Sequence, residues 1–533
     1  MVAELDEGRH NKSSTRQLMS RRFVLKAAAA AGAVGAVSSV SGATDSGSDT
    51  EEFDPIEASI AEIRTAIVTG QSTAEKIVSV YLDRIDAYND ELNAIITVNP
   101  DAVERAAELD AEFSDSGLTG PLHGVPMLLK DNYDTGDLPT TAGSVLLEGS
   151  VPPNDAFLVE QLRNAGGIVL AKANLGEFAF GDKSSLGGQV RNPYELDRSP
   201  GGSSAGTGAG IAANLGAIGT GSDTGGSIRT PSSHNNLVGI RPTLGLLSRD
   251  GIVPLSDTQD TGGPMTRTVT DAAIALDAMA GYDPADQETA RSIGNIPEDG
   301  YTSSLDASGI DDTRIGVLRE LIEGDQTTDE VLSVFEAAIA DLKAQGATIV
   351  EITDELKPVP DADVILYEPN RDINAYFDAW DDVPVETLDE LVDSGTLAPD
   401  SQDFLEDAVE INVETLDENV DYLSALSKRS AVQELLLTKM ADEELDAVTY
   451  PAKPTPPAQI GEDPAIGDIA SDLSQVTGFP AITVPAGFTE NNLPSGIEFL
   501  GRVFSEPALI EIAYSYEQAT MHRRPSEQFG PLD

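Results

Sequence analysis

The feature that most constrains the fold of this chain is a repeated alternation of short apolar runs with helical patterns. The apolar runs end in loops, and helical patterns at 155–164 and 331–344 separate some of them. Alternation of this kind predicts an α/β fold with a largely buried sheet. The runs lie at 125–129, 167–171, 217–219, 315–318, 348–352, 447–450, 482–484 and 497–500.

Further helical patterns flank or interrupt this alternating region. Isoleucines at 56, 60, 63 and 67 recur at helical spacing, and Ser72 and Glu75 have the spacing of a capping box. Two amphipathic helices are therefore predicted before the first apolar run. Residues 355–440 are acidic and helical in pattern and contain the only tryptophan, Trp380. We expect them to form a helical insertion beside the sheet.

The charge composition limits the kinds of partner. The 533 residues include 33 Lys+Arg and 91 Asp+Glu, which gives a net charge of −58. Nucleic acid is not an expected partner, because basic patches bind its phosphates. Although so high a charge also occurs in disordered chains, 40% hydrophobic residues in periodic segments predict a packed core. Abundant acids with few lysines are typical of a surface that stays soluble in strong salt.

The N-terminal segment has the pattern of an export signal. Paired arginines at 21–22 precede an apolar stretch at 27–37 and the small residues Ser41-Gly42-Ala43. This order predicts a twin-arginine signal peptide at 1–43, and hence the twin-arginine export machinery as a partner. The apolar stretch is shorter than the ~20 residues that span a bilayer, so we expect no stable membrane anchor. A flexible acidic leader at 44–54 and one folded domain at 55–533 are expected to follow, with an extracellular or cell-surface location.

Several catalytic chemistries are poorly supported. The chain has no cysteine, which excludes disulfides, thiolate metal sites and cysteine nucleophiles. Its four histidines, at 10, 123, 234 and 522, do not suggest a zinc site or a Ser-His-Asp triad, although His234 remains a candidate base. Asp-Thr-Gly occurs at 134, 223 and 260, but paired aspartic-protease loops belong to an all-β framework.

Two glycine- and serine-rich stretches, 199–206 and 221–229, favour a different chemistry. Neither is a phosphate-binding loop, because no lysine lies in residues 184–342. Glycines beside a serine allow backbone N–H groups to converge as an oxyanion hole. Lys130 ends the apolar run at 125–129 and is a candidate base, since burial lowers the pKa of a lysine. From the local pattern alone, a surface lysine that closes a strand is an equal alternative.

These stretches resemble the amidase signature family. The resemblance rests on Ser203 and Ser227, which are 24 residues apart, and on the upstream Lys130-Asp131-Asn132. Further matching pieces lie at 172–178, 239–243, 260–265 and 494–502, so the resemblance covers most of the chain after the signal. It implies a large mixed β-sheet flanked by helices on both faces, with 355–440 as an insertion.

The resemblance also implies a role for each residue of the site. Ser227 is the expected nucleophile, Ser203 bridges it to Lys130 from a cis peptide, and Lys130 is the general base. The N–H groups of Thr224, Gly225, Gly226 and Ser227 are expected to stabilise the oxyanion, and Ser204, Asp223 and Arg229 to brace the site. The family implies no metal and no organic cofactor.

The expected activity is that of a secreted amidase acting on a small-molecule or peptide amide. Residues 366–376 resemble stand-alone bacterial and peptide amidases. An alternative is the glutamine-hydrolysing subunit of a tRNA-dependent amidotransferase, although the export signal and the acidity oppose it. A non-catalytic exported solute-binding protein is a second alternative. The sequence does not predict an oligomeric state.

Overall fold

A computed structural model describes residues 53–532 except 354–355, 357–358, 360–361, 381 and 463–469. The predicted signal peptide at 1–43 and the leader as far as residue 52 lie outside the described residues.

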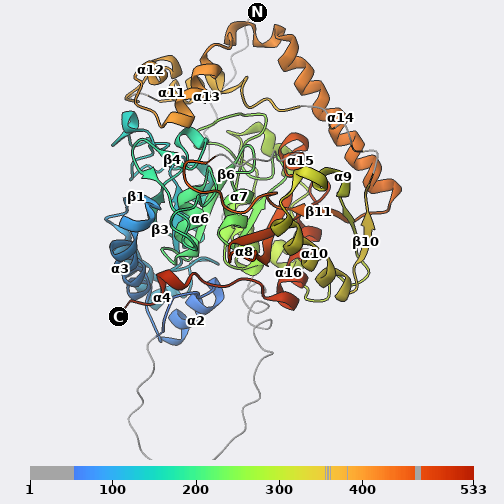
Figure 1. The fold of residues 1–533 in the computed structure, drawn as a ribbon. Helices are drawn as coiled ribbons and strands as arrows, with labels where there is room; N and C mark the ends of the chain where they lie inside the picture. Colours follow the sequence, from blue (N-terminus) through green and yellow to red (C-terminus); the bar gives the residue numbers. More distant parts are fainter. Residues whose placement is uncertain are drawn as a thin grey trace, which may run out of the picture. The chain divides into compact units, whose positions relative to one another are not determined.

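One eleven-stranded mixed sheet organises the described residues (Figure 1). Its strand order is β1-β3-β2-β6-β8-β7-β12-β13-β11-β9-β10. Strands β3, β2 and β6 are parallel neighbours, as are β11, β9 and β10, whereas the remaining neighbours are antiparallel. The strands are β1 Ile95–Val98, β2 Pro126–Lys130, β3 Ile168–Ala173, β6 Ile218–Asp223, β7 Val238–Arg241, β8 Thr261–Thr266, β9 Arg314–Val317, β10 Thr348–Glu351, β11 Ala447–Pro451, β12 Ala481–Phe488 and β13 Pro494–Leu500.

The predicted α/β fold with a large mixed sheet is confirmed. Each of the eight apolar runs contributes to a strand, and the helical patterns at 155–164 and 331–344 become α5 (Phe157–Asn164) and α10 (Asp329–Ala344). Strands β1, β7 and β8 were not predicted. A separate two-stranded ribbon pairs β4 (Lys183–Ser184) with β5 (Gly188–Gln189).

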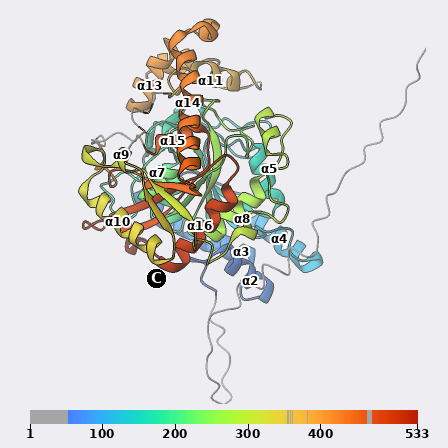
Figure 2. The ribbon, with the colours of Figure 1, turned by 90° about the vertical axis from the view of Figure 1, so that its right-hand side faces the viewer.

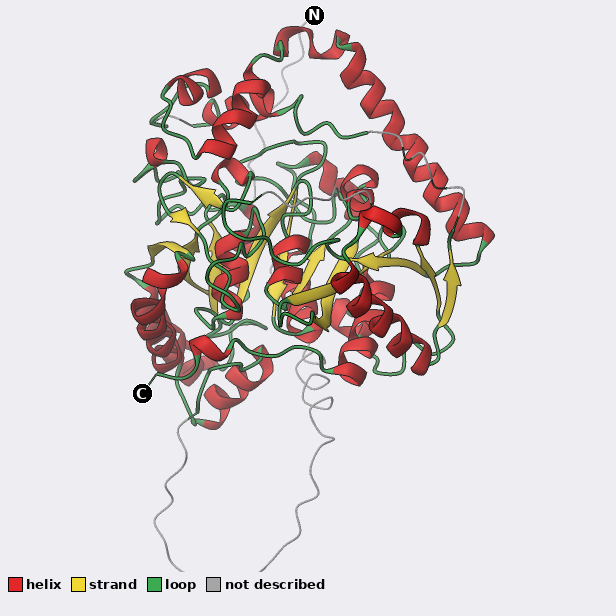
Figure 3. Cartoon of the chain, in the orientation of Figure 1, coloured by secondary structure: helices red, strands yellow, loops and turns green. Residues whose placement is uncertain are grey.

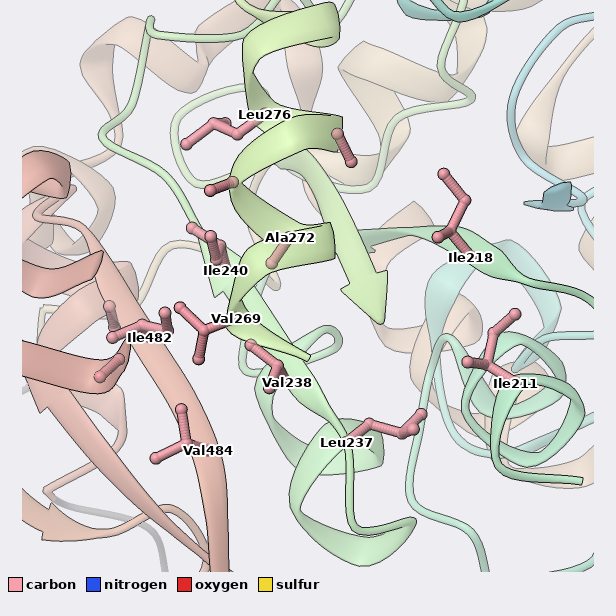
Figure 4. Close-up of a cluster of buried hydrophobic side chains, with 14 of the residues drawn as sticks. Ile211, Ile218, Leu237, Val238, Ile240, Val269, Ala272, Leu276, Ile482 and Val484 are labelled. Atoms are coloured by element: carbon pink, nitrogen blue, oxygen red, sulfur yellow. The ribbon is translucent and has the colours of Figure 1, made fainter. Parts of the chain in front are cut away.

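Helices lie on both sides of the sheet (Figures 2 and 3). Figure 4 shows how apolar side chains of α6, β6, β7, α8 and β12 meet in the core. None of the described helices is both long and apolar enough to cross a bilayer. The helices around the sheet include α4 Ala102–Ser116, α6 Ala205–Ala212, α7 Arg229–His234, α8 Val269–Met279, α9 Arg319–Ile322, α15 Asp472–Thr477 and α16 Glu506–Thr520.

The two N-terminal helices form, but their starts differ from the prediction. Helix α2 spans Ile60–Thr69 and α3 spans Ala74–Leu92. The reciprocal capping box lies at Ser59 and Glu62. The predicted box at Ser72 is wrong, because Thr73 is the N-cap of α3 and its side chain accepts from the N–H of Lys76 at 3.2 Å.

The connection from β10 to β11 contains the acidic helical region. Its helices are α11 Pro369–Phe377, α12 Leu388–Asp393, α13 Pro399–Val409 and α14 Val420–Asp442. Apolar residues of α11, α12 and α13 form a small core of their own with Phe178 and Val253. Helix α14 packs against α15 (Figure 2), and Gln475 of α15 accepts from Arg229 of the second glycine-rich stretch.

Candidate active site

Lys130 is the last residue of β2, and its side chain is completely buried. Strand β2 runs parallel to β6, with Leu128 opposite Gly219. Because β6 continues to Asp223, the end of β2 faces the residues that lead into the second glycine-rich stretch. The structure therefore rejects the interpretation of Lys130 as a surface lysine.

The Lys130 side-chain nitrogen has three oxygen partners. Nζ lies 2.7 Å from Ser203 Oγ, 2.8 Å from Ser222 Oγ and 3.3 Å from the Ser222 carbonyl. Burial lowers the pKa of Lys130 to about 7, while the charges of Asp223 and Asp260 raise it. At neutral pH a large fraction of this lysine is therefore an uncharged amine that accepts a proton.

Ser203 is presented by a cis peptide bond between Gly202 and Ser203, as the family resemblance implies. Helix α6 starts two residues later. Gly202 is required here because a Cβ on it would lie 1.9 Å from the carbonyl oxygen of Gly181. The Ser203 hydroxyl is thus held against Lys130, and only 2% of the residue surface is exposed.

Ser227 lies in the loop between β6 and α7. The N–H of Ser204 donates to the Ser227 carbonyl at 3.3 Å, which places the two glycine-rich stretches side by side. Ser227 is 8% exposed, compared with 2% for Ser203. No hydrogen bond among the described residues uses the Ser227 hydroxyl.

Asp223 braces the Ser227 loop from inside. Its carboxylate accepts from the N–H groups of Gly226 at 2.8 Å and Ile228 at 3.0 Å. It also pairs with Arg229 at 3.2 Å and Arg241 at 2.7 Å. Although burial alone raises the pKa of this carboxyl, the two arginines hold it well below its usual range.

Arg229 extends this network across the sheet. Its guanidinium donates to Glu498 Oε1 at 2.9 Å and to the Ser471 carbonyl at 2.6 Å. The Ser204 hydroxyl donates to the Ser222 carbonyl at 3.3 Å. The predicted supporting residues therefore all contact the loops that hold the two serines.

The four expected oxyanion donors differ in their hydrogen bonding. The Gly226 N–H is already committed to Asp223. Within the described part of the chain, no hydrogen bond uses the N–H groups of Thr224, Gly225 or Ser227. Those three N–H groups have no partner among the described residues, whereas the Gly226 N–H supports the turn, in which Gly226 has a φ of +106°.

Four contacts of the site were not predicted from the sequence. Ser222 contacts Lys130, Asn132 Nδ2 donates to Ser222 Oγ at 2.9 Å, Arg241 pairs with Asp223, and Asp260 accepts from the Thr224 hydroxyl. All of these residues lie inside the family-like motifs at 130–132, 221–229, 239–243 and 260–265. The spacing of a motif does not show which of its residues make polar contacts in the site and which only support the fold.

His234 is not a suitable base. It is buried at the end of α7, and its Nε2 lies 3.3 Å from the Thr455 carbonyl. Burial lowers the pKa of His234 to about 3. A group this weakly basic accepts little proton from a serine at neutral pH.

Comparison with known proteins identifies relatives over most of the chain. A family model described as Amidase matches residues 76–510. A probable amidase of Arabidopsis thaliana is 35% identical over 495 residues, which cover 88% of this chain and 91% of the plant protein. A glutamyl-tRNA(Gln) amidotransferase subunit of Thermosynechococcus vestitus is 34% identical over 490 residues, with 86% of this chain and 98% of the relative covered.

Solved structures give a similar result. The native peptide amidase of Stenotrophomonas maltophilia superposes with a TM-score of 0.79 at 36% identity, and the match covers 89% of this chain and 99% of that one. The corresponding glutamyl-tRNA(Gln) amidotransferase subunit from Thermotoga maritima gives a TM-score of 0.69 at 28% identity, over 87% of this chain and 95% of that chain.

Proposed function

This chain belongs to the amidase family and is a hydrolase of amide C–N bonds, and from that premise we propose that it works through an acyl-enzyme formed on Ser227. The observation that carries this proposal is the 2.7 Å contact between Lys130 Nζ and Ser203 Oγ in a buried site.

In the first half of the reaction, Ser227 Oγ attacks the carbonyl carbon of the substrate amide. Its proton passes to Ser203 Oγ, and the Ser203 proton passes to the neutral Lys130 amine. The N–H groups of Thr224, Gly225 and Ser227 stabilise the negative oxygen of the tetrahedral intermediate. When the C–N bond breaks, Lys130 returns the proton through Ser203 to the leaving nitrogen. Water then hydrolyses the acyl-enzyme to the carboxylic acid.

The surroundings of Lys130 suit this proton transfer. A neutral amine has two N–H donors and one lone pair. The hydroxyl and carbonyl oxygens of Ser222 take the two donors, at 2.8 Å and 3.3 Å, so the lone pair is left for the Ser203 hydroxyl. Once protonated, the ammonium has three donors for the same three oxygens, so both states of the base are satisfied.

The substrate we favour is a small-molecule amide or the C-terminal amide of a peptide. The likeness to peptide amidase supports this choice, together with the resemblance of residues 366–376 to stand-alone amidases. The likeness to the glutamyl-tRNA(Gln) amidotransferase subunits supports the second candidate, hydrolysis of glutamine beside partner proteins. The export signal in the sequence and the net charge favour the first candidate.

We also propose that the protein is exported through the twin-arginine pathway, and the support is the paired arginines at 21–22 before the apolar stretch at 27–37. We further propose that it works in strong salt with an acidic surface, and the support is the distribution of charge. Eight Lys/Arg and twelve Asp/Glu are buried among the described residues, so all other residues carry −54 of the formal charge of −58. At 1 M salt the Debye length is only about 3 Å, which screens repulsion among such charges.

The test is a hydrolysis screen of the purified protein in molar salt with aliphatic, aryl and peptide amides, read as ammonia or amine release. Ser227→Ala should abolish turnover and leave circular dichroism unchanged, whereas full residual turnover would refute the acyl-enzyme. Ammonia release from glutamine only with partner proteins would favour the amidotransferase. Failure of a fluorophosphonate to label Ser227 would favour a solute-binding protein.

A further inference from the structure

Arg429 is a buried cation that joins the helical region to the active-site loops. It lies in the middle of α14 and is 8% exposed. Its Nη1 donates to Gln259 Oε1 at 2.8 Å, and its Nη2 donates to the carbonyls of Thr258 at 3.3 Å and Gln475 at 2.9 Å. These hydrogen bonds tie α14 to two segments that lie against the Ser227 loop.

The first of these segments contains Gln259, which is completely buried. Its Oε1 accepts from Arg429 and from the Val364 N–H at 3.2 Å. Since both of these partners are donors, the amide must place its oxygen toward them and its nitrogen away. Nε2 then donates to the carbonyl of Thr224 at 3.3 Å. Arg429 and the Val364 N–H thus together select the orientation of the Gln259 amide.

The Gln259 contact determines the direction of one oxyanion donor. The peptide bond between Thr224 and Gly225 is planar and trans, so its C=O and N–H point in opposite directions. Because Gln259 holds the Thr224 carbonyl on one side, the Gly225 N–H points to the other side. That N–H has no partner among the described residues.

The second segment is α15, on which Gln475 lies beside the same loop. Its Oε1 accepts from Arg229 at 3.3 Å, and a Cβ on Gly225 would lie 3.6 Å from its Nε2. Arg429 holds the Gln475 carbonyl at 2.9 Å. The Arg429 guanidinium therefore restrains two residues that lie beside the Thr224–Gly225 peptide, Gln259 and Gln475, which belong to different segments of the chain.

We propose that Arg429 is a positioning residue that acts through Gln259 to aim the Gly225 N–H at the oxyanion. This inference rests on the proposed function, because it assigns a purpose to the oxyanion loop of the same site. Arg429 itself makes no contact with the three triad residues. The N–H that it aims meets a negative oxygen only in the transition state, so we expect its loss to lower kcat more than substrate binding. An oxyanion donor that is lost outright costs about 10²–10³ in kcat.

The test compares Arg429→Met with Lys428→Met, which removes the neighbouring positive charge of α14, on the best amide from the screen. We expect Arg429→Met to lower kcat by about tenfold or more with KM within about twofold, and Lys428→Met to change neither. Gln259→Leu should reproduce the loss, and the double variant should be no worse than the single ones. Arg429→Lys should recover part of kcat.

A second measurement separates positioning from a structural role. A peptide aldehyde that forms a tetrahedral adduct on Ser227 places a negative oxygen in the hole, whereas the corresponding peptide alcohol is uncharged and forms no adduct. Arg429→Met should weaken binding of the aldehyde by the same factor as kcat/KM and leave binding of the alcohol unchanged. Equal weakening of both ligands, or wild-type kcat in Arg429→Met and Gln259→Leu, would overturn the inference. If Ser227→Ala retained turnover, the proposed function itself would fail instead.

Discussion

Replacement of Lys130 by methionine should stabilise the protein while it abolishes hydrolysis. Methionine fills a similar volume without a charge, and the lysine is completely buried. Burial lowers the pKa of Lys130 to about 7 from an ordinary 10.5. Because the folded state binds this proton more weakly than the unfolded state does, the charged ammonium lowers the free energy of unfolding at every pH at which the lysine is protonated.

The sign and size of the effect follow from proton linkage. Below pH 7 the lysine is charged in both states, and the folded state bears the whole cost. Above pH 7 only the unfolded state stays charged, so the cost shrinks and vanishes near pH 10.5. The two values set an upper limit of about 5 kcal/mol at low pH. Loss of the three contacts to Ser203 and Ser222 offsets about 2–3 kcal/mol, since each hydrogen bond contributes about 1 kcal/mol.

We therefore expect Lys130→Met to raise the free energy of unfolding by about 2–3 kcal/mol at pH 6–7. The gain should fall by about 1.4 kcal/mol per pH unit between pH 7 and 9. Urea unfolding followed by circular dichroism at several pH values measures both quantities. A variant no more stable than the wild type at pH 6, or a difference that does not change with pH, would refute the reasoning.

Lys172, the other lysine that is buried among the described residues, supplies a matched control. Lys172 lies on β3 and pairs with buried Asp131 at 3.2 Å, and its Nζ also donates to Thr140 Oγ1 at 2.8 Å. Because Lys172→Met leaves the carboxylate without its cation, we expect it to destabilise the fold by about 3–5 kcal/mol. The two lysine-to-methionine changes should thus have opposite signs.

Three further outcomes are expected. The value of kcat/KM should rise about tenfold per pH unit below an inflection near pH 7 and then level off, because the proposed mechanism requires the neutral form of Lys130; a rate that is flat from pH 5 to 8 would contradict this role. Ser222→Ala should move that inflection to lower pH, because the ammonium loses an acceptor at 2.8 Å; a pH–rate profile measures the shift, and movement to higher pH would be inconsistent with the contact. Asp223→Asn should lower the free energy of unfolding by about 3–5 kcal/mol, because two buried arginines lose their anion; urea titration at pH 7 measures it, and a change below about 1 kcal/mol would argue against the brace.

Strands with continuous apolar runs were predictable, whereas strand β8 was not. Its sequence contains Gly262, Gly263 and Pro264, which are typical of a turn. The structure explains the glycines by close approach, since a Cβ on Gly263 would lie 2.2 Å from the Ile240 carbonyl and one on Gly262 would lie 2.5 Å from Tyr133 Oη. Such contacts join segments far apart in the chain, so no local pattern records them.

The same limit explains which parts of the site were found. Lys130, Ser203 and Ser227 lie in motifs that resemble the amidase signature family, and this resemblance made them candidates. Arg429 and Gln259 are 170 residues apart. Neither lies in a pattern that marks a functional pair, because the sequence of 355–440 predicts only a helical insertion. Their relation appears only when the fold brings the two side chains together.

A neutral lysine base in so acidic a chain requires that nearby carboxylates be compensated. Asp223 and Asp260 both raise the pKa of Lys130. Asp223 is one member of a buried cluster in which Arg229 and Arg241 face Asp223 and Glu498. Two cations and two anions give this cluster no net charge, so the arginines oppose the pull of Asp223 on the Lys130 proton. Loss of Arg241 alone would leave the anions in excess and favour the ammonium, which is the inactive form. The basicity of Lys130, the proposed base, therefore depends on the buried arginines as well as on its own burial.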